Sequence, residues 1–154
     1  MSHKIYTRAP EAVTDLDQIE AALHLMGYTA VVRPVSGQRH YTRRGDELLV
    51  SAACLPKDLP KVYGTYEYLG YRRTASGAVE RIVDDMFVDQ RTGQLNSAPA
   101  LFEGLVKQAY LAAGITAALT ASGIAFTVQT AVSGDIEILP QLPAPSIGAV
   151  ATGI

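Results

Sequence analysis

The long apolar run from Pro99 to Ser122 constrains the fold of this chain more than any other stretch. Apolar residues recur along it at intervals of three and four positions, which is typical of a helix that buries one face. Ser97 and Pro99 suit an N-cap and a first turn, and Gly123 suits the left-handed residue that ends a helix. The expected core stripe consists of Leu101, Leu105, Ala109, Ala112 and Leu119, widened by Phe102, Val106, Ala113 and Ala117.

Two glycines, Gly104 and Gly114, lie inside this expected helix. Each costs about 1 kcal/mol relative to alanine in a helix interior. Either another surface packs closely against the helix there, or the helix bends near Gly114. The sequence leaves both explanations open.

The N-terminal third predicts a strand, a helix and a second strand. Residues 3–8 suit a short strand, and a helix is expected to begin at Thr14, with Asp17 completing a capping box, and to end at Gly27. The segment Tyr28–Val35 is rich in β-formers, and Pro34 places it at an edge or an end. The buried stripe of this helix is expected at Leu16, Ile19, Leu23 and Met26.

The rest of the chain predicts short strands joined by turns. Residues 36–45 are polar and turn-prone, and residues 55–60 contain two prolines and suit a loop. Strands are expected in Glu47–Cys54, in Val62–Tyr71 with Ala78–Asp85 after a turn at Ser76 and Gly77, and in a second hairpin of Ile124–Ala131 with Asp135–Leu139.

These elements together predict an α+β domain over residues 1–139, with two helices packed on one face of a largely antiparallel sheet. The helix exits Ala22–Val32 and Ala118–Val128 share the order helix, glycine, strand. Pseudo-duplicated β-α-β-β units would explain this likeness, and so would chance, because glycine commonly ends helices. Residues 140–154 form a separate apolar tail rich in proline, alanine and glycine.

Several segments in this order carry a family resemblance. They are Ser2-His3, Asp15–Tyr28, Tyr68–Asp85, Val106–Tyr110, Ala118–Val128 and Gly134–Ile138. Their order resembles the hypothetical chloroplast reading frame 35 family of plastid, cyanobacterial and other bacterial proteins, over most of residues 2–139. The resemblance implies an α+β domain. The family has no established activity, so it supplies no catalytic residues.

Composition and charge exclude several classes of protein. The net charge is −2, 18% of residues are charged, and there is one cysteine, Cys54, so an intramolecular disulfide is impossible and a strongly basic nucleic-acid protein is not indicated. No stretch is apolar enough for a signal peptide or a membrane span. We expect a soluble cytoplasmic protein that makes no membrane contact.

Groups able to do chemistry are few and scattered. The chain has no phosphate-binding glycine loop and no nucleophile-elbow motif. His24 is expected on the flank of the first helix, Cys54 as a buried thiol, and the acids Asp84 and Asp85 as solvated residues at a strand end, although a divalent ion between them and His3 is conceivable. We therefore assign no catalytic residue, metal or cofactor and expect no enzyme, leaving an enzyme of unrecognised type as a third interpretation.

One basic segment suggests binding. Between Arg33 and Arg73 there are eight basic and four acidic residues, with tyrosines among them. Such a set could bind single-stranded nucleic acid or another anion, or it could be a solvated rim or protein interface. The candidate binding residues are Arg39, Tyr41, Arg43, Arg44, Tyr68, Tyr71, Arg72 and Arg73.

The C-terminal tail suggests docking on a protein, through Leu142, Ile147, Val150 and Ile154. With no catalytic signature, the first hypothesis is an accessory or structural subunit that binds a partner or a copy of itself. The anion-binding module is the alternative.

Overall fold

The computed structural model describes residues 4–32, 39–50, 69–89, 91–95, 97–130 and 135–141. Contacts divide the chain into two compact units, residues 1–113 and residues 114–154. The boundary falls inside one continuous helix, α2 (Ser97–Ala121). The prediction of a single domain over residues 1–139 stays a prediction, and the two units are described separately below.

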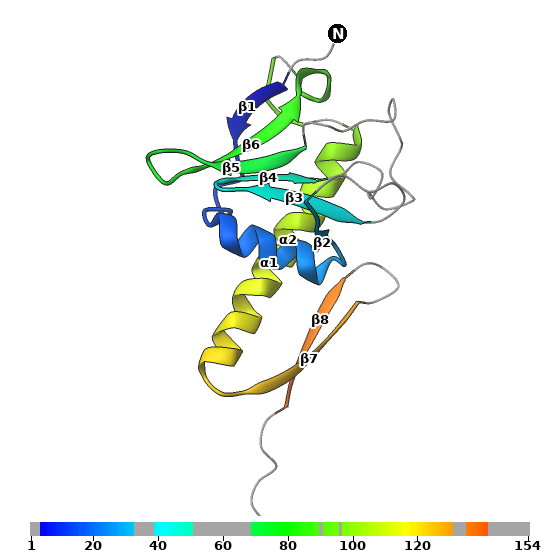
Figure 1. Ribbon diagram of the computed structural model, residues 1–154. Coiled ribbons are helices and arrows are strands. Elements are labelled where there is room, and N and C mark those ends of the chain that lie inside the picture. The colour runs from blue at the N-terminus through cyan, green and yellow to red at the C-terminus, as the bar shows by residue number, and fades with distance from the viewer. Residues whose placement is uncertain are drawn as a thin grey trace, which may run out of the picture. The chain divides into compact units, whose positions relative to one another are not determined.

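The first unit contains a six-stranded sheet. Its strands, in chain order, are β1 (Lys4–Arg8), β2 (Thr29–Ala30), β3 (His40–Arg44), β4 (Glu47–Val50), β5 (Gly70–Arg73) and β6 (Val79–Asp84). Their order across the sheet is β1-β6-β5-β4-β3-β2, and all neighbours are antiparallel except β2 and β3 (Figure 1). This confirms the α+β class and the largely antiparallel sheet.

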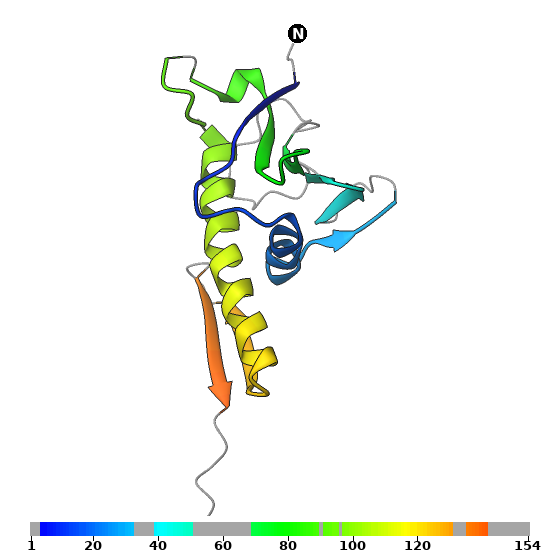
Figure 2. The ribbon, with the colours of Figure 1, turned by 90° about the vertical axis from the view of Figure 1, so that its left-hand side faces the viewer.

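Both helices cover the same face of this sheet, as predicted (Figures 1 and 2). The side chains of Tyr41 on β3, Tyr71 on β5 and Arg81 on β6 point to that face, because they form hydrogen bonds to α1 (Leu16–Leu25) or to α2. We call this side the helix face and the other side the outer face. The core of the unit lies between the helix face and the two helices.

Helix α1 begins one residue later than the sequence pattern suggested. Asp15, not Thr14, is the N-cap, and its side chain accepts a hydrogen bond from the backbone N–H of Asp17 at 2.9 Å. The side chain of Asp17 instead forms ion pairs with the sheet, so the expected capping box is absent. The predicted stripe is buried at Leu16, Ile19 and Leu23.

The two helix exits are alike in detail. Gly27 and Gly123 have φ values of +86° and +70°. Each helix ends with an equivalent backbone hydrogen bond of 2.9 Å, from the N–H of Tyr28 to the oxygen of Leu23 in α1 and from the N–H of Ile124 to the oxygen of Leu119 in α2. The strands that follow pair differently, since β2 runs parallel to β3 and β7 (Ala125–Thr130) runs antiparallel to β8 (Ile136–Gln141). The likeness therefore covers the helix ends alone.

One expectation about secondary structure and part of one about burial were wrong. Residues 36–45 were expected to be turn-prone, yet His40–Arg44 form β3 within the sheet. Leu101 was expected in the core stripe of α2, yet its side chain is 56% exposed, while Phe102 and Val106 are fully buried. Ala109, Ala112 and Ala113 are buried as predicted, whereas Ala117 is exposed, so the predicted face of α2 is confirmed except at Leu101 and Ala117.

The sequence offered close packing against another surface as one reason for Gly104 and Gly114, and the structure tests this at Gly104. A Cβ built on Gly104 meets no atom within 4 Å, so close packing does not explain this glycine. Gly70 has the opposite environment, because a Cβ there would lie 1.9 Å from the backbone oxygen of Leu48. The close approach of β5 to β4 therefore requires glycine at position 70.

The predicted turn at Ser76 and Gly77 is confirmed. Gly77 has a φ of +88° in the turn between β5 and β6, and the backbone N–H of Thr74 donates to the oxygen of Ala78 at 2.8 Å. The remaining expected segments, namely residues 33–35, 51–68 and 131–134 and the tail from residue 142, lie outside the described residues.

Candidate functional site

A hydrogen-bonded chain of side chains joins α1 to β3 on the helix face. The hydroxyl of Tyr41 donates to Oε2 of Glu20 at 2.6 Å, and Nε2 of His24 lies 2.6 Å from the same hydroxyl. Because the single hydroxyl proton is given to Glu20, Nε2 of His24 must carry a proton and donate to Tyr41. His24 is exposed on α1. We call this chain of hydrogen bonds from His24 through Tyr41 to Glu20 the relay. It uses Nε2 of His24, and Nδ1 is the ring nitrogen that takes no part in it.

Burial and charge shift the pKa values in this relay. Burial of Tyr41, and then the nearby carboxylate of Glu20, raise the pKa of the Tyr41 hydroxyl above its usual range. Burial also opposes ionisation of Glu20, but hydrogen bonds from Tyr41 and Arg43 outweigh it and hold the pKa of Glu20 below its ordinary value. Tyr41 therefore stays a neutral donor, and Glu20 stays an acceptor.

The arginines beside this relay are neutralised by acids. Arg43 lies 2.7 Å from both Asp17 and Glu20, and Arg73 lies 3.5 Å from Asp17 and 3.3 Å from Asp46. The pairing with Arg43 holds the pKa of Asp17 below its usual range. These two arginines therefore tie α1 to the sheet.

The outer face carries a second cluster, which sequence analysis identified only in part. The guanidinium carbon of Arg72 lies 3.3 Å from the ring centre of Tyr6, and Nζ of Lys4 lies 5.6 Å from it. Arg72 also pairs with Glu80 at 3.2 Å, and Lys4 approaches Glu47 at 3.8 Å. Tyr6 is 39% exposed and was not among the predicted residues. Its position two residues from Lys4 in a predicted strand was the available signal.

The structure divides the predicted Arg/Tyr set between two faces of the sheet. Arg43 and Arg73 lie on the helix face, and Arg44 and Arg72 lie on the outer face. Tyr41 and Tyr71 are 0% and 1% exposed, so neither ring offers the stacking surface that was expected. Arg39 is exposed and donates to the backbone oxygen of Met26 at 3.1 Å, and Tyr68 lies outside the described residues. Binding of an anion remains a prediction, but these residues do not form one surface.

A buried ion pair attaches α2 to the sheet. Nε of Arg81 donates to Glu103 at 2.6 Å, and its Nη2 contacts the other oxygen of the same carboxylate. Nη1 of Arg81 donates to the hydroxyl of Thr7 at 3.1 Å, and the hydroxyl of Tyr71 lies 3.4 Å from Glu103. Burial, and then the charge of Glu103, raise the pKa of Tyr71. This network is structural, since it is enclosed between α2 and β6.

Tyr110 completes the junction between the two helices. Its hydroxyl accepts hydrogen bonds from the backbone N–H groups of Thr14 and Asp15 at 3.2 and 3.1 Å. The amide of Gln18 donates to the backbone oxygen of Tyr110 at 2.8 Å. Tyr110 on α2 thus satisfies N–H groups just before α1, where a helix end needs acceptors.

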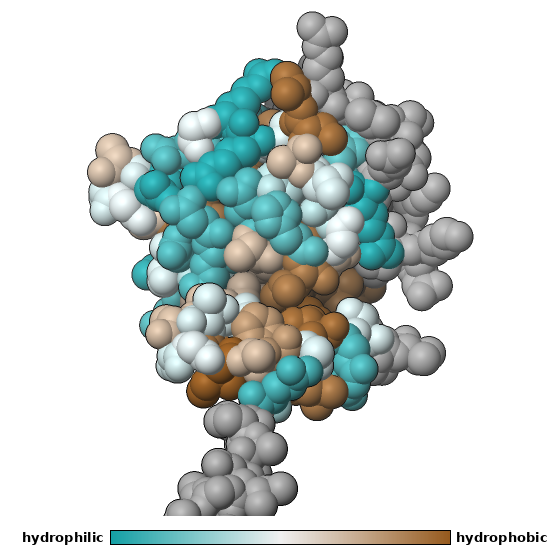
Figure 3. Space-filling view, turned by 60° about the horizontal axis from the view of Figure 1, so that its bottom comes forward, coloured by the Kyte–Doolittle hydropathy of each residue, from teal (hydrophilic) through white to brown (hydrophobic). Residues whose placement is uncertain are grey.

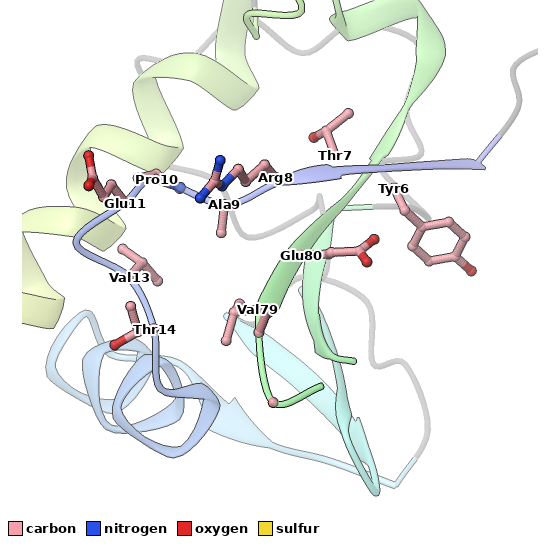
Figure 4. Close-up of a pocket in the computed structure, with 12 residues that line it drawn as sticks. Tyr6, Thr7, Arg8, Ala9, Pro10, Glu11, Val13, Thr14, Val79 and Glu80 are labelled. Atoms are coloured by element: carbon pink, nitrogen blue, oxygen red, sulfur yellow. The ribbon is translucent and has the colours of Figure 1, made fainter. Parts of the chain in front are cut away.

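A cavity of about 460 Å³ lies where β1 separates from β6. Figure 4 shows lining side chains from β1, from the connection that follows it and from β6. Val13 and Val79 contribute apolar surface, Thr7 and Thr14 contribute hydroxyls, and Arg8 is the basic group of the lining. The lining is therefore mixed, with the carboxylates of Glu11 and Glu80 beside Arg8.

The acids expected at the end of β6 differ in their environments. Asp84 is 3% exposed, which corrects the expectation that it is solvated, whereas Asp85 is partly exposed in the 3₁₀ turn η2 (Asp85–Phe87). Within the described ranges, no three histidine, cysteine, aspartate or glutamate side chains gather closely enough to hold a metal ion. His3 and Cys54 lie outside those ranges.

The second unit differs from the first in having no buried residue among those described. Its hairpin is amphipathic, because the register pairs Phe126 with Pro140 and Val128 with Ile138 on one face. We call this side, which also carries Ile136, the apolar face of the hairpin. The opposite face carries Thr127, Leu139 and the hydrogen-bonded pair Gln129 and Glu137.

Apolar surface of this unit reaches solvent. Val128 is 37% exposed, Leu139 is 48% exposed and Ile115 on α2 is 53% exposed. In the space-filling view of the chain, brown apolar surface lies beside teal polar surface on the face drawn (Figure 3). The predicted docking residues Leu142, Ile147, Val150 and Ile154 lie outside the described residues, so docking of the tail is untested.

Comparisons with protein-family models, with curated proteins and with solved structures give no match for this chain. The resemblance to the plastid family therefore remains a prediction. Among the helices described, none combines the length and the apolar character needed to cross a bilayer.

Proposed function

We propose that this chain is a non-catalytic binding subunit, and that its second unit is the surface that contacts another protein chain. One observation carries the proposal. The hairpin β7–β8 has an apolar face, yet none of the described residues from 114 onward is buried.

The energetics of a small hairpin support this proposal. An isolated two-stranded hairpin is marginally stable in water, and it needs a third strand or a packed layer to become stable. Phe126, Ile136 and Ile138 are only partly buried, and Val128 is exposed. A protein partner that covered this face would remove their remaining apolar surface from water, which stabilises the complex by about 25 cal/mol per Å².

The arginines of the first unit support the same proposal, because many of them are already used within the fold. Its arginines Arg43, Arg72, Arg73 and Arg81 are each paired with an acid. The charges of these four arginines are therefore compensated within the fold, and two of the predicted stacking rings are buried. The anion-binding alternative is accordingly the less supported one.

Amide hydrogen exchange on the dilute full chain tests the proposal. The amides of β7 and β8 are expected to exchange quickly in the free chain, because few apolar contacts protect them. The amides of β5 and β6 are expected to exchange slowly. Protection of the β7 and β8 amides should then increase when a partner protein is added. It should also increase at higher concentration of the chain if the partner is a second copy.

Two neighbouring residues of β8 provide a matched pair of variants. Ile138→Asp places a charge on the apolar face and should abolish the added protection, whereas Leu139→Asp places the same charge on the opposite face and should retain it. If the hairpin of the dilute chain is as well protected as β5 and β6, the second unit is complete by itself and the proposal fails.

A further inference from the structure

The described part of the chain has four strands at sheet edges, and three of them carry features that prevent further pairing. β1 carries Lys4 and Arg8, β2 is only two residues long, and β8 contains Glu137 and Pro140. Short length, charge and proline are the devices by which proteins keep an edge strand from adding another strand.

The fourth edge strand, β7, carries none of these devices. It has six residues, Ala125–Thr130, without proline, glycine or charge. Five of the six are exposed, and Phe126 is partly exposed. In the sequence, no charged residue occurs from Gln108 to Gly134. An exposed, uncharged edge strand of this length is a template for pairing with another strand.

We propose that β7 pairs with β7 of a second copy of this chain, antiparallel and about a twofold axis, to form a four-stranded sheet from two hairpins. This inference rests on the proposed function, because it names the partner of the second unit. Four strands exceed the minimum at which a sheet becomes stable. The contact is the same on both copies, so it closes at a dimer.

Symmetry restricts the register of this pairing. A twofold axis perpendicular to the sheet leaves each side chain on its own face, so residues directly opposite one another must differ by an even number of positions. The axis then passes at Thr127, which pairs residues 125–129, or at Val128, which pairs residues 126–130. In either case the apolar faces of the two hairpins become continuous, with Phe126 and Val128 of both copies on the same side.

A second copy suits this edge better than a charged partner does. Because β7 has no charge, two copies meet without repulsion, and nothing on the strand selects a partner by charge. The chain itself supplies a complementary surface, since the second hairpin has the same alternation of apolar and polar residues.

Disulfide trapping on the full chain tests the geometry. Cys54, the single cysteine, is first replaced by Ser, and Thr127→Cys is then compared with Leu139→Cys under mild oxidation. These residues lie opposite each other on the same face of one hairpin. In the proposed dimer the two copies of position 127 are within about 8 Å, whereas the two copies of position 139 are three strand spacings apart, about 14 Å. Thr127→Cys should cross-link at least about tenfold faster.

Charge exchange at the same position tests the symmetry. Thr127→Lys and Thr127→Glu should each raise the dissociation constant of the dimer about two- to fivefold, because like charges then face each other across the axis. An equimolar mixture of the two variants should restore the affinity. One chain has a mass of 16.4 kDa. Light scattering of the unaltered chain should give twice this mass.

Three results would overturn the inference. They are a chain that remains monomeric at high concentration, equal cross-linking at positions 127 and 139, and a mixture of charge variants that fails to regain affinity. Any of these, combined with rapid exchange of the hairpin amides, rejects pairing through β7 and leaves the proposed binding function in place. Slow exchange in the dilute monomer rejects both.

Discussion

Removal of one partner from the buried Arg81–Glu103 pair should be the most damaging single change in the first unit. The side chains of Arg81 and Glu103 are only 9% and 15% exposed. Glu103→Leu would leave the guanidinium of Arg81 with its hydrogen bond to the hydroxyl of Thr7 and without a counter-charge. The loss of one member of a buried pair costs about 3–5 kcal/mol. This is a large share of the roughly 5–15 kcal/mol that stabilises a typical domain.

Replacement of both partners gives a different expectation. Arg81→Met combined with Glu103→Leu removes both charges and keeps most of the volume, and such exchanges are often neutral or stabilising. Tyr71 would lose its 3.4 Å contact with Glu103, and Thr7 would lose its bond from Arg81, at about 1 kcal/mol each. The double variant should therefore lie within about 2 kcal/mol of the unaltered chain.

Urea unfolding followed by far-ultraviolet circular dichroism measures these free energies. Tyrosine fluorescence is a second probe, because the chain has eight tyrosines and no tryptophan. Glu11→Leu, at an exposed glutamate of the first unit, serves as a control and should change stability by less than about 0.5 kcal/mol. If Glu103→Leu costs less than about 1 kcal/mol, or if the two single changes simply add, the guanidinium is not held as a buried charge, and the argument is wrong.

Three further predictions concern single positions in the first unit. The folded-state pKa of Glu20 lies below its ordinary value of 4.5. The stabilising effect of the ionised Glu20 is therefore complete above pH 4.5 and is lost as the pH falls through the folded-state pKa. Urea unfolding between pH 7 and pH 3 should show a shallower loss of stability for Glu20→Gln than for the unaltered chain. Gly70→Ala should cost about 3 kcal/mol in the same assay, because its Cβ would overlap the backbone oxygen of Leu48; a cost below about 1 kcal/mol would contradict the close approach of β4 and β5. Gly104→Ala should instead raise the melting temperature, by a gain of about 1 kcal/mol in an exposed helix position with open space around it.

Local signals explain why the helices could be predicted. The ends at Gly27 and Gly123 follow from single residues that tolerate positive φ values, and the turn at Gly77 has the same cause. The buried face of α2 was harder to predict because its sequence is apolar on most sides. Leu101 and Phe102 were both in the expected stripe, and only the packed fold distinguishes the exposed leucine from the buried phenylalanine.

Strand β3 shows the limit of periodicity as a signal. His40–Arg44 contain one residue, Tyr41, that is both aromatic and fully buried, between polar residues that resemble a turn. Its position in the sheet depends on antiparallel pairing with β4 and on the bond to Glu20, which lies 21 positions earlier. Such partners cannot be identified from the local sequence.

The spatial arrangement of the candidate binding residues could not be predicted, for the same reason. The positive charge of the segment from Arg33 to Arg73 was correctly counted, but its compensation comes from elsewhere, as when Arg73 pairs with Asp17, 56 positions away. Side-chain alternation along β6 puts Arg81 and Val79 on one face. The local sequence does not show that Glu103 on α2 lies above that face.

The distribution of charge then separates the roles of the two units. The first unit uses its charges internally: Arg43, Arg73 and Arg81 connect the sheet to α1 and α2 through acids on those helices. The described hairpin of the second unit has only Asp135 and Glu137 as charged residues. Under the proposed function, the second unit would therefore bind its partner through apolar area and backbone hydrogen bonds. Of the two, backbone pairing is directional, and β7 is the edge of the described sheets on which neither charge, proline nor short length opposes it.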